Sequence, residues 1–321
     1  MNPPLVSILI PCYNAAPWLA QTLESALVQT CPHKEIIVVD DGSTDDSASI
    51  VRTYADRGVR LVTQENRGAA AARNHALQHA QGNFIQFLDA DDLLAPDKIE
   101  QQMRGLGIAD GLIAAGPWGR FDDNPAAAVF TPEANWRDSK PVDWLALNFA
   151  GRGMMPPAAW LTPRSLIEAA GPWDERLTLN DDGEYFCRVL LAANRVIFCA
   201  NARSFYRSNL AGSLSRRRTD AAWRSAFLSQ DLCAQHLLAR EASPRTRRAC
   251  ADLFQRLAFA AYPDDPGLVR QCEAKVRSYG GSDQRPGGGR GFRVVTRLLG
   301  WKFAQRLRAW ARPKTGKPSS L

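Results

Sequence analysis

The first ninety residues alternate short apolar runs with stretches of helical periodicity. Four of the runs are predicted to be strands, and they span residues 6–10, 36–39, 59–63 and 84–88. Short runs of this kind, bounded by turn residues, are typical of strands that are buried on both faces of a parallel sheet. Strands that alternate with helices form βαβ units. We therefore predict an α/β fold with a Rossmann-like, mostly parallel sheet.

Polar side chains follow three of the predicted strands. They are Tyr13 and Asn14 after the first, Asp40 and Asp41 after the second, and Asp89 and Asp91 after the fourth. Right-handed crossovers bring these strand ends to one edge of the sheet, where ligands of open α/β sheets bind. The edge therefore predicts a nucleotide pocket. In it, Asp41 would accept a hydrogen bond from a base and Tyr13 would stack, a packing role being the alternative for Tyr13.

The acids after the fourth strand predict a cation site. Side chains alternate along a strand, so Asp89 and Asp91 point to the same side. Two carboxylates this close repel each other unless a positive charge lies between them. A divalent cation with oxygen ligands, Mn²⁺ or Mg²⁺, would meet this need and would hold a diphosphate. The simpler alternative is that these acids only begin the next helix, predicted at 96–103.

Four motifs carry a resemblance to a known family. They are P-x-Y-N at 11–14, VDDGSTD at 39–45, N-R-G-x-x-x-A-R-N at 66–74 and LDADD at 88–92. In this order they resemble glycosyltransferase family 2, whose members are inverting enzymes with the A-type glycosyltransferase fold. The resemblance implies a nucleoside diphosphate sugar donor, with UDP-sugar favoured, a divalent metal, and a saccharide or lipid-linked acceptor.

The resemblance also assigns roles to residues of these motifs. It places Pro11, Tyr13, Asn14 and Asp41 around the nucleoside, Arg73 and Asn74 near the diphosphate, and Asp89 with Asp91 at the ribose and the metal. From their chemistry alone, Arg67 and Arg73 are predicted to contact the phosphates, because a guanidinium group binds phosphate in a bidentate way. An ordinary charge on a helix surface is the alternative for Arg73.

Residues 171–192 resemble the second half of the same family. A glycine, an aromatic residue and an aspartate precede a loop that ends in an acidic pair, Asp181 and Asp182. The resemblance implies that Asp182 is the catalytic base. The family usually has Glu-Asp here, so which acid of the pair contacts the acceptor stays open, and Glu184 is a less favoured third candidate. Capping of a helix predicted at 184–192 is the alternative role for the pair.

The sequence pattern divides the chain into four parts. The predicted catalytic domain, 1–215, has a nucleotide-sugar-binding half at 1–110 and an acceptor half at 111–215. A helical extension at 216–279, a flexible glycine-rich linker at 280–291 and a basic amphipathic tail at 292–321 follow. Further strands are expected at 112–115, 158–162, 196–199 and 204–207, with a helix at 164–170. Ser43 and Asp46 are expected to form a capping box for a helix that runs to Tyr54.

Positive charge is concentrated in the tail. From Gln284 onward the chain has ten Lys and Arg residues and no Asp or Glu, which leaves 30 basic and 33 acidic residues in 1–283. Apolar side chains recur there at helical spacing: Phe292, Val295, Leu299, Phe303, Leu307 and Trp310. A basic amphipathic helix over 292–310 suits an anionic membrane surface. Docking on the enzyme or on a second subunit is an equal alternative, and nucleic-acid binding is not expected.

Cysteine usage and hydropathy suggest where the protein is found. The seven cysteines are odd in number and form no C-x-x-C motif, which indicates reduced thiols. We see no apolar run long enough to cross a bilayer and no signal peptide. We therefore expect a cytoplasmic protein, peripheral at the inner face of the membrane if the tail binds lipid.

These features together predict a metal-dependent inverting glycosyltransferase. It would move a sugar from a nucleoside diphosphate sugar to a hydroxyl acceptor in cell-surface glycan or glycolipid assembly. No Q-x-x-R-W motif follows the acidic pair, so a non-processive enzyme is expected. The alternative is a nucleotide-sugar-binding protein without transferase activity. A nucleotidyltransferase would need a glycine-rich basic loop after the first strand, which this chain lacks.

Overall fold

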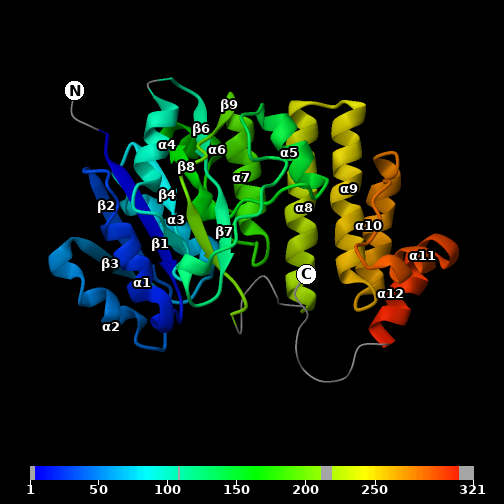
Figure 1. Ribbon diagram of the computed structural model, residues 1–321, viewed down its shortest axis with the longest axis horizontal. Coiled ribbons are helices and arrows are strands. Elements are labelled where there is room, and N and C mark those ends of the chain that lie inside the picture. Colours follow the sequence, from blue (N-terminus) through cyan, green and yellow to red (C-terminus); the bar gives the residue numbers. More distant parts are fainter. Residues whose placement is uncertain (1–3, 108, 211–218, 311–321) are drawn as a thin grey trace.

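The computed structural model describes residues 4–107, 109–210 and 219–310. A sheet flanked by helices comes first in the chain, and a helical region follows it (Figure 1). The predicted boundary between 215 and 216, and residues 311–321 of the predicted tail, lie outside the described residues. Among the described residues, no helix is both long and apolar enough to cross a lipid bilayer.

The four strands predicted in the first ninety residues all form and lie parallel. They are β1 (Val6–Cys12), β2 (Lys34–Asp40), β3 (Val59–Thr63) and β4 (Phe84–Phe87). The helices that connect them are α1 (Ala16–Leu27), α2 (Ser47–Arg52) with the short 3₁₀ helix η1 (Ala55–Arg57), and α3 (Ala69–His79). The carboxyl ends of β1, β2 and β4 therefore meet at one edge of the sheet, as the sequence pattern predicted.

The second half of the chain completes the sheet and adds a smaller one. Within the described residues, the large sheet has the order β3-β2-β1-β4-β8-β6-β9. Its added strands are β6 (Leu112–Ala115), β8 (Trp160–Pro163) and β9 (Arg195–Phe198), of which β8 alone is antiparallel to its neighbours. The small sheet joins β5 (Leu93–Leu94), β10 (Ser204–Arg207) and β7 (Trp118–Phe121). It brings residue 207 next to the loop that follows β4.

The remaining helices cover the sheet and build the helical region. Around the sheet these are α4 (Lys98–Leu106), α5 (Pro141–Phe149), α6 (Arg164–Ala170) and α7 (Asp181–Ala192), with the 3₁₀ helices η2 (Pro125–Ala127) and η3 (Pro157–Ala159). The helical region contains α8 (Asp220–Arg240), α9 (Pro244–Ala261), α10 (Pro266–Ser278), α11 (Arg290–Leu299) and α12 (Trp301–Trp310). The helical extension predicted from the sequence is therefore present. All seven cysteines are free thiols, as their number and spacing indicated.

Both faces of the large sheet are buried. Side chains alternate along β1, so Ile8 and Ile10 pack in one apolar cluster while Leu9 packs in the other. The first cluster includes Leu19 and Leu23 of α1, and the second includes the alanine-rich side of α3. Burial on both faces explains why β1 is apolar along most of its length rather than alternating.

Two local predictions are wrong in detail. Ser43 and Asp46 form no capping box: α2 begins at Ser47, the Asp46 side chain makes no capping hydrogen bond, and the Ser43 hydroxyl accepts a hydrogen bond from the Asn14 N–H at 2.9 Å. The single tail helix is broken at Gly300, whose φ of +80° is in the left-handed region that favours glycine.

A close approach of two backbone segments makes Gly82 a test of this packing. A Cβ atom on Gly82 would lie 2.5 Å from the backbone N of Ser7 and 2.9 Å from the carbonyl oxygen of Leu5. We expect Gly82→Ala to lower the free energy of unfolding by about 1–3 kcal/mol, because the backbone must shift to accommodate the methyl group. Urea denaturation measures this. Gly287→Ala is the matched control, since a Cβ atom on Gly287 would meet no described atom within 4 Å, and equal losses in both variants would contradict the prediction.

Candidate functional site

A buried arginine joins the two halves of the predicted catalytic domain. Arg73, on α3, donates from Nη1 to Asp181 Oδ2 and from Nη2 to Asp89 Oδ1, both at 2.7 Å. Its side chain is only 7% exposed, and its guanidinium group lies 4.5 Å from the ring centre of Trp173. Arg73 is therefore not an ordinary charge on a helix surface, which was the alternative to a role in the site. It brings an acid from the loop after β4 next to an acid at the start of α7.

The acidic pair lies in the first turn of α7, three residues earlier than the predicted helix start. Burial raises the pKa of Asp182 to about 6, the negative charge of Asp181 adds to this effect, and Arg73 acts in the opposite direction. The Oδ1 atom of Asp182 accepts a hydrogen bond from the Gly183 N–H at 2.9 Å. A carboxylate that titrates near pH 6 is well suited to act as a general base near neutral pH.

The third candidate base, Glu184, is already engaged. It is 2% exposed and accepts hydrogen bonds from Arg188 Nε at 2.7 Å and Nη2 at 2.8 Å. His236 Nε2 lies 3.4 Å from the same carboxylate. The Glu184–Arg188 ion pair lies within α7, and His236 of α8 lies next to it. This leaves Asp181 and Asp182 as the acids of this helix at the sheet edge.

The loop after β4 holds two further acids in different environments. Burial, together with the charge of Asp89, raises the pKa of Asp91 to about 6. Asp92 is 1% exposed, and burial and the charge of Asp91 raise its pKa well above the ordinary value. Its Oδ1 atom accepts a hydrogen bond from the Arg207 N–H at 2.8 Å. Asp92 thus ties the loop to β10 through the Arg207 N–H.

The oxygen atoms at this edge fit a metal that is completed by substrate. No side chain among the described residues donates a hydrogen bond to the Asp91 carboxylate, whose pKa is raised by burial and by the charge of Asp89. The described part of the chain contains no cluster of three or more His, Cys, Asp or Glu side chains arranged to bind a metal alone. Mg²⁺ commonly binds proteins through one or two carboxylates plus substrate phosphates, and Asp91 with Asp89 matches that donor set.

Arg207, which sequence reasoning missed, holds the Asp91 loop in place. It is 4% exposed and donates to the Asp91 carbonyl at 2.9 Å, the Asp122 carbonyl at 2.8 Å and Gln21 Oε1 at 2.7 Å. Its guanidinium group also lies 4.4 Å from the ring centre of Phe121. The strand at 204–207 was predicted, but its pairing with β5 was not, and that pairing brings Arg207 to the loop.

On the nucleoside side, Asp41 organises a loop. It is 3% exposed, and its carboxylate accepts hydrogen bonds from the N–H groups of Arg67 at 2.9 Å and Gly68 at 2.8 Å, and from Gln64 Nε2 at 2.7 Å. Tyr13, at the end of β1, is 49% exposed and is free to stack on a planar ligand. Its direct neighbour Asn14 binds the Thr44 N–H through Oδ1 at 2.8 Å. Pro11 is the penultimate residue of β1.

Arg67 and Asn74 fasten the acceptor half to α3 and the loop that precedes it. Asn74 exchanges two hydrogen bonds with the backbone of Trp173, at 2.8 and 3.0 Å. Glu175 accepts from Asn74 Nδ2 at 3.0 Å and from Arg67 Nη2 at 2.7 Å. The predicted contacts of Arg67, Arg73 and Asn74 with the diphosphate stay predictions, since all three side chains bind protein groups here.

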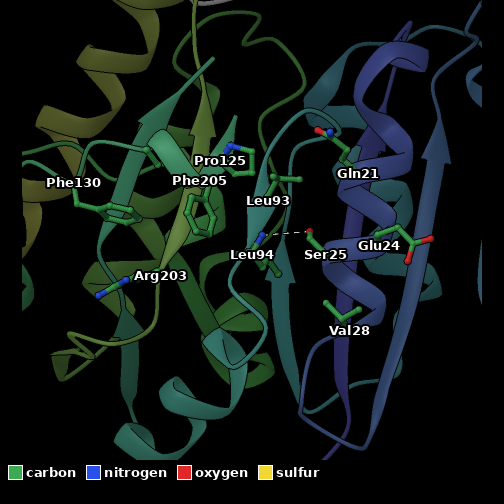
Figure 2. Close-up of a pocket in the computed structure, with 12 residues that line it drawn as sticks. Gln21, Glu24, Ser25, Val28, Leu93, Leu94, Pro125, Phe130, Arg203 and Phe205 are labelled. Carbon is green, nitrogen blue, oxygen red and sulfur yellow. Dashed lines mark hydrogen bonds between the residues drawn. The ribbon is translucent and has the colours of Figure 1, made fainter. Parts of the chain in front are cut away.

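An open depression of about 560 Å³ lies between α1 and the small sheet (Figure 2). Leu93, Leu94 and Phe205 form part of its apolar lining, and Ser25 Oγ accepts a hydrogen bond from the Leu94 N–H at 3.3 Å. None of the predicted site residues lines it. The candidate site is therefore the acidic edge around Arg73 rather than this depression.

Comparison with known proteins agrees with the geometry of the edge. The family model described as "Glycosyl transferase family 2" matches residues 7–162. The chain carries a family 2 glycosyltransferase domain. Residues 7–162 contain the acids that follow β2 and β4 and the whole of α3, whereas Asp181 and Asp182 lie beyond the matched range.

Two relatives from Bacillus subtilis (strain 168) resemble this family 2 protein. It is 32% identical over 225 residues to "Putative glycosyltransferase EpsH", a match that covers 67% of this chain and 64% of the relative. It is 47% identical over 103 residues to "Putative teichuronic acid biosynthesis glycosyltransferase TuaG", covering 31% of this chain and 41% of the relative. The chain thus spans just under two thirds of the length of the first relative and about two fifths of the length of the second.

Two solved structures share the fold of the family 2 domain. Residues 1–349 of S. aureus TarS, in complex with UDP-GlcNAc, superpose with a TM-score of 0.62 at 17% identity, covering 86% of this chain and 89% of that one. The mannosyltransferase PcManGT from Pyrobaculum calidifontis, in complex with GDP-Man and Mn²⁺, gives a TM-score of 0.52 at 19% identity, covering 96% and 87%. The A-type glycosyltransferase fold predicted from the sequence is confirmed.

The Arg73 contact makes a prediction about stability and pH. We expect Arg73→Gln to lower the free energy of unfolding at pH 8 by about 2–4 kcal/mol, because the carboxylates of Asp89 and Asp181 lose their buried partner. Burial already raises the pKa values of Asp182 and Asp91 and Arg73 lowers both, so without the arginine these two pKa values should lie still further above the unfolded value of about 3.9. The folded variant then binds more protons than the unfolded chain, so the loss should shrink as the pH falls from about 8 to about 5.

Urea denaturation at both pH values measures this effect. Arg67→Gln is the matched control, because the Arg67–Glu175 ion pair is on the surface, with Arg67 63% exposed, and such pairs contribute about 0–1 kcal/mol. A loss for Arg73→Gln that is small, or that does not depend on pH, would show that the Arg73 ion pairs contribute little.

Proposed function

We propose that this chain is an inverting glycosyltransferase that transfers a sugar from a nucleoside diphosphate sugar to a hydroxyl acceptor. The observation that carries the proposal is the position of Asp182. This acid, with a pKa raised by burial to about 6, directly follows Asp181, and Arg73 joins Asp181 to Asp89 in the loop that also holds Asp91. One base and one phosphate-binding edge, next to each other, are the parts that a single displacement needs.

We propose that Asp182 takes the proton of the acceptor hydroxyl. The acceptor oxygen forms a bond to the anomeric carbon as the bond from that carbon to the diphosphate oxygen breaks, and the electron pair leaves with the diphosphate. A single displacement from the opposite face inverts the anomeric centre, as it does in inverting glycosidases. Asp181, held by Arg73 at 2.7 Å, fixes the first turn of α7 and so positions Asp182.

The other residues of the edge would bind and orient the donor. Tyr13 would stack on the base, and the loop fixed by Asp41 would lie beside the nucleoside. Asp91 and Asp89 would hold a divalent metal, which when bound neutralises the charge of the diphosphate leaving group. Complexes of the two structural neighbours with UDP-GlcNAc and with GDP-Man and Mn²⁺ support a donor of this class.

We place the reaction in cell-surface polysaccharide assembly, with transfer of one sugar per encounter. The name of one relative, which assigns it to teichuronic acid biosynthesis, supports the polysaccharide setting. A UDP-sugar is the favoured donor, and a saccharide or a lipid-linked saccharide is the favoured acceptor.

Release of nucleoside diphosphate tests the proposed transfer. With a panel of UDP- and GDP-sugars and saccharide acceptors in Mn²⁺, we expect the wild type to release the nucleoside diphosphate of one donor. Asp182→Asn should lower kcat by roughly 10²–10⁴-fold, the usual contribution of a general base, and leave donor affinity nearly unchanged. The kcat/KM of the wild type should fall as the pH drops below about 6, because the base must be deprotonated.

Matched variants separate the possible outcomes. Glu184→Gln is not expected to remove the pH dependence, since Glu184 is paired with Arg188. Full transfer by Asp182→Asn would exclude Asp182 as the base. Donor binding without nucleoside diphosphate release by the wild type, across the whole panel, would instead identify a nucleotide-sugar-binding protein.

Metal dependence has its own prediction. Asp91→Asn should weaken binding of UDP in the presence of Mn²⁺ by at least about tenfold, because a neutral amide is a poorer ligand for a hard cation than a carboxylate. Without metal, the variant and the wild type should bind UDP with similar affinity. Calorimetry with and without Mn²⁺ measures both, and Asp97→Asn, on an acid before α4, is the control. Equal Mn²⁺-dependent affinities for Asp91→Asn and the wild type would remove Asp91 from the metal site.

A further inference from the structure

Helices α11 and α12 carry most of the exposed apolar surface of the described chain. We call residues 290–310 the C-terminal hairpin. Nine large apolar side chains are exposed among the described residues, and six of them lie on the hairpin: Val294, Leu298, Leu299, Phe303, Leu307 and Trp310. Their exposed fractions run from 45% for Leu307 to 85% for Trp310. Concentration of apolar side chains in one place marks an interaction surface rather than ordinary scatter.

One side of the hairpin is fixed to the helical region. The Trp301 ring packs edge-on against the rings of Phe259 and Tyr262, with centres 4.9 and 5.3 Å away. Ala304, one turn later, is buried, and Lys302 Nζ lies 2.8 Å from Glu273 Oε1. Docking on the protein, one of the two alternatives that the sequence left open, therefore accounts for this side of α12.

The other side of the hairpin stays uncovered by described residues. Phe303, Leu307 and Trp310 follow i, i+4, i+7 spacing, so they form a stripe on α12 separate from that of Trp301 and Ala304. On α11, where no residue is buried, Val294 and Leu298 form a similar pair at i, i+4. A second partner is needed to cover these side chains.

The charge around the uncovered side identifies that partner as anionic. Arg293 and Arg297 are exposed on α11. The sequence from Gln284 to its end holds ten basic and no acidic residues. A ligand for this surface must combine negative charge with an apolar interior that can receive leucine, phenylalanine and tryptophan side chains.

We propose that the C-terminal hairpin docks on the surface of a bilayer that contains anionic lipids. Its apolar side chains would enter the boundary between head groups and acyl chains, and its arginines would bind the lipid phosphates. A symmetric contact between two hairpins would place two strongly basic surfaces together, which repel. Nucleic acid would neutralise the arginines but would leave the apolar stripe in water.

The position of the hairpin suits a flat partner. In Figure 1 it lies at one end of the molecule, beyond α10 and at the opposite end from β3. A surface can therefore reach α11 and α12 from that end without meeting the large sheet. Trp301 and Ala304 hold the hairpin in place before binding, so little ordering is required when it docks.

Vesicle flotation of the full chain tests the proposal. We expect the chain to float with vesicles of phosphatidylcholine and about 30 mol% phosphatidylglycerol, to float poorly with phosphatidylcholine alone, and to bind less as salt rises. Leu298→Gln with Leu307→Gln should lower the partition coefficient by roughly 10–100-fold, since each change removes an apolar side chain from the lipid boundary. Arg293→Gln with Arg297→Gln should lower binding to the anionic vesicles and flatten its salt dependence.

Val28→Gln with Val129→Gln is the matched control, because these two valines are 52% and 65% exposed and lie outside the hairpin. It should float like the wild type, and all variants should keep the wild-type Tm. Failure of the wild type to float with anionic vesicles, or normal flotation of Leu298→Gln with Leu307→Gln, would overturn the proposal. If light scattering shows a dimer that this double variant turns into a monomer, without vesicle binding by the wild type, the surface joins two copies of the chain.

Discussion

The candidate site depends on one buried cation that bonds to acids from both halves of the catalytic fold. Arg73 sits 2.7 Å from Asp89, which follows β4, and 2.7 Å from Asp181, which begins α7. With Asp182 next to them, these acids would repel one another strongly at the low effective dielectric of a partly buried edge. The guanidinium group offsets that repulsion and stacks on Trp173, so the same contact assembles the site and sets its charge. A lysine would not replace it, because a single ammonium group lacks the planar fork that reaches two carboxylates at once.

Elements with a strong local signal could be predicted from the sequence. The apolar runs in β1, β2 and β4 and the strand at 112–115 were found because burial on both faces leaves little room for polar residues. The antiparallel insertion of β8 between β4 and β6 was not found, since no residue of β8 reports its direction. The role of Ser43 was not predicted either, since its hydroxyl accepts a hydrogen bond from the Asn14 N–H instead of capping α2. There a contact distant in sequence replaced the local hydrogen bond that the motif favours.

For the site, the acids were predictable and their partners were not. Asp41, Asp89, Asp91 and the pair at 181–182 follow strands or open a helix, and strand ends converge by topology alone. Which cation faces which acid depends on side-chain packing. Arg73 was expected at the phosphates but contacts two carboxylates, and Arg207, 116 residues beyond Asp91, reaches the Asp91 carbonyl only because β10 pairs with β5. The loop between β4 and β5 is thus held in shape by a strand from the far end of the catalytic fold.

The break at Gly300 explains how one amphipathic sequence serves two surfaces. An unbroken helix over 292–310 would present a single apolar stripe along its length, and that stripe could face either the protein or another partner. The glycine, at φ +80°, ends α11 and lets α12 start in a new direction. Trp301 and Ala304 can then pack against α9 and its end while Phe303, Leu307 and Val294 stay in contact with solvent. The apolar spacing was read correctly from the sequence, but its division between two sides follows from the backbone of one residue.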